Sequence, residues 1–290
     1  MSNKLEFGLF DSFGPFEMNE FPTVREVYEA HLKDAVEAEQ LGYRYYFFIA
    51  SLVRVHRAVG SEVAVGDRRV RLAANLAIDR QTINQAETLG FSRLTASMIP
   101  QSFEGYWPAP LYPYDSQRAR QLLAEAGYPN GFDAGMISVD MANASFAEAV
   151  AGYWGAVGIR ATLRPQERAA FFKEYGEKRF KHIIQSTSAA QGNAATRLDA
   201  FVAGAGLFTY GTYPDIEGLI REQATELDRA KREAILHRIQ RLIHEKVMYA
   251  PLMEPAILAG YGPRVAESAI GLITNMAGST PYEELRLKGK

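Results

Sequence analysis

Cysteine is absent from the 290-residue sequence, which excludes disulfides, thiolate metal sites, lipid-modified cysteines and cysteine nucleophiles. A large excess of charge of either sign is also absent, since 32 Lys and Arg residues face 34 Asp and Glu residues. The resulting net charge of −2 creates no long-range field that would attract nucleic acid or an anionic membrane surface. We therefore expect no nucleic-acid partner, while either redox compartment stays compatible with the composition.

Long apolar runs are missing as well. The longest, Tyr45–Val53, reaches about half of the ~18–20 residues that a membrane-spanning helix requires, and it contains Ser51. The amino terminus, MSNKLEFGLFDSFG, has neither a continuous apolar core nor the small-residue cleavage site of a secretory signal. These absences predict that the chain is not an integral membrane protein and that, as it stands, it remains in the cytoplasm.

The familiar catalytic motifs are absent too. The sequence has no G-x-S-x-G nucleophile elbow, no P-loop and no G-x-G-x-x-G, and Met248 stands where a zinc-protease motif beginning at His244 needs its second histidine. His237 and His244 lie two turns apart on a predicted helix. We expect solvent-facing or partly packed histidines there, with a metal pair as the alternative. The sequence thus predicts no catalytic residue, no metal site and no cofactor.

The first 49 residues have the pattern of one βαβ unit. Leu5–Phe10 reads as a short apolar strand, and Thr23 with Glu26 fits the capping box of a helix that ends at Gly42. The next segment, YRYYFFI, is typical of a strand buried on both faces. EFGLFDSF and VREVYEAHLKDAVEAEQLGYRYYFFI together resemble the opening of luciferase-like flavin-dependent monooxygenases, which are TIM barrels.

That resemblance implies a flavin site, but part of the family's pattern is missing from this chain. In this family the second strand leads into an acidic residue beside the flavin pocket, whereas the present chain continues Ile49-Ala50-Ser51. A complete barrel also needs ~250 residues. Flavin-dependent oxidation resting on residues 1–49 is therefore the alternative function, together with a fusion that has no retained activity.

From residue 66 onward, strand and helix signals alternate, which predicts an α/β layer architecture. Asp79 and Asp115 are placed to cap two helices, and Ser145 with Glu148 fits a second capping box. The predicted strands are GFDAGMISVD, IRATLRP, HIIQSTSA and YAPLM, and a long helix is expected over roughly 225–247.

Several blocks of this region resemble the family 5 extracytoplasmic solute-binding proteins of ABC importers, the peptide- and nickel-binding group. The blocks are VRLAANLAIDRQTIN, YPYDSQRARQLLAEAGYPNGFD, AVGIRATLRP, YPDIEGLI, ELDRAKREAILHRIQRLIHEKVMYAPL and PYEELRLK. The resemblance implies a two-lobed clamshell that closes on a small-molecule solute and delivers it to ABC permease subunits outside the cytoplasmic membrane. It covers the second lobe and the C-terminal segment, which predicts an incomplete clamshell.

The expected domain organisation combines both resemblances. It consists of a luciferase-like βαβ fragment at 1–49, a junction at 50–65 and a solute-binding lobe at 66–290. The residues of the junction carry no pattern that assigns them to either part.

The candidate ligand site is the segment STSAAQGNAATRLDAF and the residues that follow it, which combine small side chains with a few polar and aromatic groups. Peptide-binding relatives carry an acidic residue in the corresponding loop, but Thr187–Gln191 contains none. A buried ammonium would lack a counter-charge there, so we expect a neutral ligand such as a sugar, with an anion at Arg197 as the alternative. The candidate ligand-binding residues are Ser188, Gln191, Asn193, Arg197, Tyr210 and Tyr213. Helix capping or an ion pair with Asp199 for Arg197, and packing for the tyrosines, are the structural alternatives.

Overall fold

A computed structural model describes residues 46–47, 50–55, 64, 66–188, 192–257, 264–269, 272 and 281–288. For residues 46–47, 50–55, 188 and 257 only the backbone is described. The strand expected at Leu5–Phe10 and the helix expected after Thr23 lie outside the described residues. The chain divides into two compact units, one made of Met1–Phe48 with Ala256–Lys290 and the other of Ile49–Pro255.

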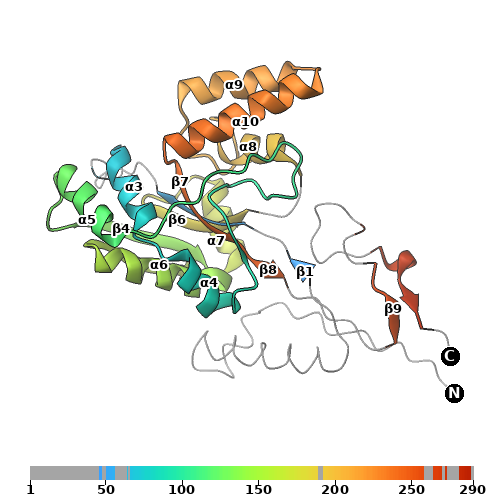
Figure 1. Cartoon of the computed structure of the whole chain (residues 1–290), viewed down its shortest axis with the longest axis horizontal. Coiled ribbons are helices and arrows are strands. Elements are labelled where there is room, and N and C mark those ends of the chain that lie inside the picture. The colour runs from blue at the N-terminus through green and yellow to red at the C-terminus, as the bar shows by residue number, and fades with distance from the viewer. Residues whose placement is uncertain are drawn as a thin grey trace. The chain divides into compact units, whose positions relative to one another are not determined.

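The larger unit is built on a six-stranded sheet in the order β3-β7-β2-β6-β4-β5 (Figure 1). β4 is parallel to β5 and to β6, whereas β2 is antiparallel to both β6 and β7, so β4, β5, β6 and β7 all run in one direction. The strands are β2 (Ala50–Val55), β3 (Arg93–Leu94), β4 (Phe132–Asp140), β5 (Ile159–Gln166), β6 (Ile183–Ser188) and β7 (Tyr249–Glu254).

Strand β2 differs from the sequence-based expectation, which placed a patternless junction at 50–65. Residues 50–55 lie inside the sheet, between β6 and β7. Arg54 interrupts the apolar run of this strand, which hid its strand character in the sequence. Its backbone pairs with residues 183–188 and 249–253, so its place in the sheet depends on partners far along the chain.

Eight α-helices are described in this unit: α3 (Arg68–Leu76), α4 (Arg80–Thr88), α5 (Ser116–Glu125), α6 (Ala144–Ala156), α7 (Arg168–Gly176), α8 (Ala194–Phe201), α9 (Pro214–Thr225) and α10 (Arg229–Glu245). Asp79 and Asp115 cap α4 and α5 as the sequence predicts, because their carboxylates accept hydrogen bonds from backbone N–H groups of the first turn. The capping box expected from Ser145 and Glu148 is not formed, since the N-cap of α6 is Asn143, two residues before Ser145.

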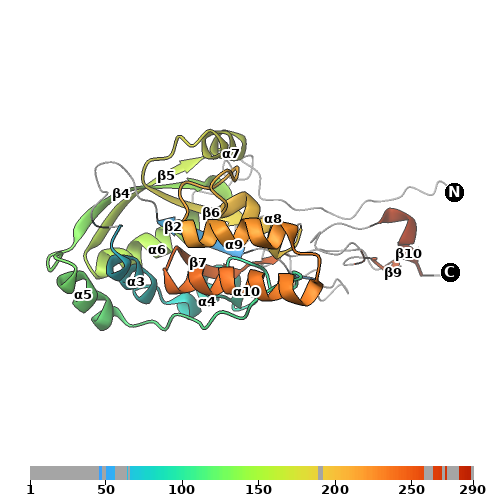
Figure 2. The ribbon, with the colours of Figure 1, turned by 90° about the horizontal axis from the view of Figure 1, so that it is seen from above.

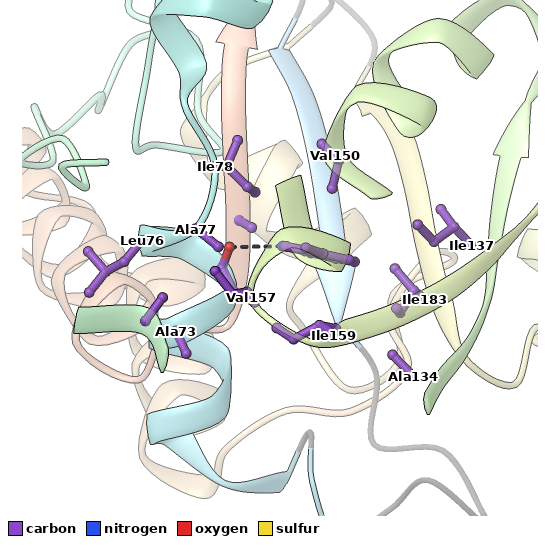
Figure 3. Packing of buried hydrophobic residues seen from close by; sticks show 14 of the residues in the cluster. Ala73, Leu76, Ala77, Ile78, Ala134, Ile137, Val150, Val157, Ile159 and Ile183 are labelled. Atoms are coloured by element: carbon purple, nitrogen blue, oxygen red, sulfur yellow. Dashed lines mark hydrogen bonds between the residues drawn. The ribbon is translucent and has the colours of Figure 1, made fainter. Parts of the chain in front are cut away.

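Two hydrophobic cores lie on opposite faces of this sheet. One core joins the sheet to α3, α4, α5 and α6, and the other joins it to α7, α8, α9 and α10. Figure 1 shows α8, α9 and α10 on one side of the sheet and α4 and α6 on the other, and Figure 2 shows α9 and α10 side by side. In the first core, Ile137, Ile159 and Ile183 of three neighbouring strands pack near Val150 of α6 (Figure 3). The fold is therefore α/β, as the sequence predicts.

The smaller unit contributes two short pairs of strands. β1 (Tyr46–Phe47) is antiparallel to β8 (Ala256–Ile257), and β9 (Val265–Glu267) is antiparallel to β10 (Arg286–Leu287). Among the described residues of both units, no helix combines the length and the apolar character needed to cross a bilayer.

Candidate functional site

The C-terminal edge of the parallel strands is the place where an open α/β sheet most often binds a ligand. β4, β5, β6 and β7 end there at Asp140, Gln166, Ser188 and Glu254, so each of these strands finishes on a polar side chain. The predicted loop starts from the same edge, because it follows β6. The topology thus places the predicted segment where a ligand is expected.

Asn193, within the predicted loop, is engaged in starting helix α8. Its side-chain oxygen accepts a hydrogen bond from the Thr196 backbone N–H at 3.0 Å, and its own N–H donates to the Thr196 hydroxyl at 3.0 Å. Gln191 lies outside the described residues, and of Ser188 only the backbone is described, paired with Ala50. The ligand-binding role of these three residues therefore stays a prediction.

Arg197 of α8 lies in the core rather than at the surface, with 5% of the residue exposed. Its guanidinium lies 5.4 Å from the ring centroid of Phe103 and 5.5 Å from that of Phe201. Burial lowers the pKa of Arg197 to about 10, so the side chain stays a cation at neutral pH. The sequence could not distinguish this packing from an anion site, because the packing depends on the ring of Phe103, which is distant in the sequence.

Tyr210 has a packing role. Its hydroxyl accepts a hydrogen bond from the Phe180 N–H at 3.3 Å and donates to the Tyr175 carbonyl at 3.2 Å. The Lys178 ammonium lies 5.5 Å from the ring centroid of Tyr210. The packing alternative is therefore the one that the contacts of Tyr210 support.

Tyr213 packs elsewhere, at the start of α9. Its hydroxyl accepts a hydrogen bond from Arg71 at 3.3 Å, and the Lys246 ammonium lies 4.6 Å from its ring centroid. Tyr213 thus ties α9 to α3 and to the end of α10. Asp215 in the first turn of α9 forms an ion pair with Lys246 at 3.0 Å, and the hydrogen bond to that lysine lowers the pKa of Asp215.

Two acidic residues at the C-terminal edge, which the sequence analysis did not select, are each paired with an arginine. Asp140 lies 2.7 Å from Arg168, and Glu254 lies 3.3 Å from Arg93 while accepting a hydrogen bond from the Gln101 N–H at 2.9 Å. Burial raises the pKa of Glu254. Each acid terminates an apolar strand, and that position in the sequence is the signal that could have identified it.

Gln185 of β6 is the second feature that sequence reasoning missed. The residue is fully buried, and neither its amide oxygen nor its amide nitrogen has a hydrogen-bond partner among the described residues. Backbone pairing places Gln185 beside Val139 of β4, so both side chains point to the face covered by α6. A polar residue directly after Ile183 and Ile184 was the signal in the sequence that could have identified Gln185. An unsatisfied buried amide costs about 1–3 kcal/mol.

We expect Gln185→Met to raise the free energy of unfolding by about 1–2 kcal/mol, because an apolar side chain of similar length removes the cost of burying the amide. Chemical denaturation followed by circular dichroism measures this change.

Gln240→Met is the matched control, because Gln240 is also buried but its amide makes three hydrogen bonds. That variant should lose about 1–3 kcal/mol. Destabilisation of both variants to the same extent would show that the Gln185 amide is satisfied in solution.

A family comparison identifies the chain. The model described as "Bacterial extracellular solute-binding proteins, family 5 Middle" matches residues 18–208. The chain therefore belongs to the family 5 bacterial extracellular solute-binding proteins. The match begins well inside the segment that resembles luciferase-like enzymes. Among the described residues, no three His, Asp or Glu side chains gather in a way that could hold a metal ion.

Individual relatives bind different ligands. The chain is 25% identical over 233 residues to heme-binding protein A of Haemophilus influenzae, covering 77% of this chain and 42% of the relative. It is 26% identical over 211 residues to the glutathione-binding protein GsiB of Escherichia coli K12, covering 67% of this chain and 40% of that protein. The chain thus spans about two fifths of the length of these curated relatives.

Solved structures share the fold. The periplasmic binding protein DppA of Helicobacter pylori, in complex with the peptide STSA, superposes with a TM-score of 0.75 at 21% identity, covering 89% of this chain and 51% of that one. NikA of Brucella suis, in complex with Fe(III)-EDTA, gives 0.72 at 19% identity, covering 93% of this chain and 56% of that one. These similarities place the described residues in the fold of periplasmic binding proteins.

Proposed function

We propose that this chain captures a small solute for an ABC importer and presents it to permease subunits outside the cytoplasmic membrane. The observation that carries the proposal is the match of residues 18–208 to the solute-binding family. The C-terminal edge of β4–β7 supports it, because this edge is where such a sheet binds ligands. Capture of this kind forms no covalent bond, so we infer that the chain is not an enzyme.

The proposed solute is polar and uncharged. Asp140 and Glu254, the two acids that end strands at this edge, are each matched by an arginine and are both almost completely buried. Arg197 lies in the core between two aromatic rings. A solute ammonium or carboxylate would have to displace one of these arrangements, whereas a neutral polar group needs only hydrogen bonds.

The luciferase-like interpretation of residues 1–49 stays a prediction. Residues 18–49 fall within the match to the solute-binding family, which favours a solute-binding origin for that part of the segment.

A matched set of solutes tests the proposal on the full chain. It consists of a dipeptide with free termini, the same dipeptide acetylated and amidated, and a neutral disaccharide. A bound solute at about 100 times its Kd stabilises the folded state by about 2.7 kcal/mol, which corresponds to a rise in Tm of roughly 5–10 °C. We expect this rise with a neutral solute in scanning calorimetry. A rise only with the free dipeptide would contradict the proposed solute class, and no rise with any neutral or charged solute of a wider panel would contradict capture itself.

A further inference from the structure

A loop that the proposed function does not use is fastened along helix α10. Residues 105–114, here called the strap, lie between β3 and α5 in the sequence. Two side chains and one backbone carbonyl of α10 hold the strap through hydrogen bonds. Gln240 accepts a hydrogen bond from the Trp107 N–H at 3.0 Å and donates to the Gly105 carbonyl at 2.6 Å, and the Nε2 of His237 lies 3.0 Å from the Tyr106 carbonyl oxygen. Tyr112 donates to the backbone carbonyl of His244 at 3.0 Å.

The three α10 positions form one face of the helix, because 237, 240 and 244 are three and four residues apart. The ring of His244 stacks on the Tyr112 ring at a centroid distance of 4.6 Å and an interplanar angle of 26°. The Trp107 ring meets it edge-on at 6.0 Å. The imidazole thus contacts two aromatic side chains of the strap, Trp107 and Tyr112.

These groups line a narrow pocket between the strap, α10 and β7. Its volume of about 10 Å³ leaves room for roughly one water molecule. The lining includes Ser97, Trp107, Tyr112, Gln240, His244 and Tyr249. The pocket is too small for a solute.

His244 is placed to make this closure depend on pH. Its Nδ1 is buried and has no hydrogen-bond partner among the described residues. Protonation of a neutral imidazole would put a second N–H on the ring, and a buried N–H without an acceptor is costly. Burial lowers the pKa of His244, and the positive charge of Arg68 acts in the same direction.

Most other charged groups near the His244 imidazole and the aromatic rings that contact it are cationic. Arg241 of α10 lies 5.8 Å from the Trp107 ring centroid, and Arg80 of α4 lies 5.8 Å from that of Tyr112. Burial raises the pKa of Tyr112 to about 12, so this phenol stays neutral. On β7, Tyr249 donates its hydroxyl proton to the Phe201 carbonyl at 2.6 Å. The carboxylate of Glu245 is the acidic group that favours the protonated ring.

We propose that the strap is an acid-sensitive latch, in which protonation of His244 releases residues 105–114 from α10. The docked strap holds the neutral imidazole, whose pKa lies below the ordinary value near 6.5, whereas a released strap lets His244 titrate near that value. Docking is therefore fully stable above about pH 6.5, and it weakens as the pH falls below this value through the lowered pKa of the docked form.

Hydrogen exchange of the full chain at pH 7.5 and pH 5.0, corrected for intrinsic rates, tests the latch. We expect protection of the hydrogen-bonded amides of Tyr106 and Trp107 to fall about fivefold at pH 5.0, while protection in α6 stays unchanged. His244→Phe keeps an aromatic ring for stacking but cannot be protonated, so its strap should show the same protection at both pH values. His244→Gln is a second non-titrating variant with the same expectation.

His237→Gln is the matched control, because this histidine lies on the same face and its amide replacement can still donate to the Tyr106 carbonyl. That variant should keep the loss of protection in acid. The proposal is overturned if the wild-type strap is equally protected at both pH values. It is also overturned if both non-titrating variants lose protection in acid as the wild type does.

Discussion

Replacing Trp154 with alanine is expected to lower the free energy of unfolding by about 3–5 kcal/mol. Trp154 lies in α6 with only 1% of the residue exposed, in the core that joins α3, α4, α5 and α6 to the sheet. Its indole N–H donates to the Ala74 carbonyl at 2.9 Å. Ala74 belongs to the last turn of α3, where carbonyl groups have no partner within the helix. The alanine variant therefore loses both packing and a helix-terminal hydrogen bond.

Trp154→Phe separates the two losses. Phenylalanine keeps much of the apolar volume but cannot donate to Ala74, so we expect a loss of about 1–2 kcal/mol. Guanidinium denaturation followed by far-ultraviolet circular dichroism measures both variants without relying on tryptophan fluorescence. Equal losses for the two variants would contradict the claim that packing supplies the larger share.

Local signals in the sequence predicted much of this fold because their physical cause is local. Asp79 and Asp115 could be assigned as helix caps, since a cap needs only a side-chain oxygen within three residues of a free N–H. Ile159 could be assigned to a strand and Val150 to the buried face of a helix from periodicity alone. Each of these assignments depends on fewer than about ten neighbouring residues.

Strand β2 could not be predicted in the same way, because its stability comes from two partner strands that are distant in the sequence. The candidate site was also difficult to predict because contacts between residues distant in the sequence determine it. Arg197 has a sequence context that suits an anion site, but Phe103, almost a hundred residues earlier, supplies one of the rings that hold it in the core. Tyr213 similarly receives its hydrogen bond from Arg71. Composition selected the candidate loop, which stays a prediction, while tertiary contacts show which of the candidate side chains are engaged in packing.

The ion pairs at the C-terminal edge show what such contacts add. Asp140 and Glu254 each looked like the end of an apolar strand, and the residues that neutralise them, Arg168 and Arg93, carry no motif. Because both acids are neutralised, the ends of β4 and β7 offer hydrogen-bonding groups rather than net charge. This argument for an uncharged solute depends on the structure, although the lack of an acid in Thr187–Gln191 pointed in the same direction.

Gly131→Ala is expected to lower the free energy of unfolding by about 3–4 kcal/mol, because the new methyl group would collide with backbone. A Cβ atom at this position would lie 1.9 Å from the carbonyl oxygen of Gly158 and 2.5 Å from its carbonyl carbon. The same carbonyl accepts a hydrogen bond from the Phe132 N–H at 3.0 Å, where β4 and β5 begin to pair. The two strands must therefore separate at their first contact to accommodate the methyl group.

Gly127→Ala is the matched control, since it measures the cost of the positive φ without the cost of the collision. Gly127 also has a positive φ, +95° against +74° at Gly131, but a Cβ added there would meet no atom within 4 Å. Its expected cost is the left-handed conformation alone, about 1–2 kcal/mol. Urea denaturation of both variants should thus show a difference of roughly 2 kcal/mol. If the two losses are equal, the close approach of Gly131 to Gly158 does not hold in solution, and the start of the β4–β5 pairing is looser than the structure shows.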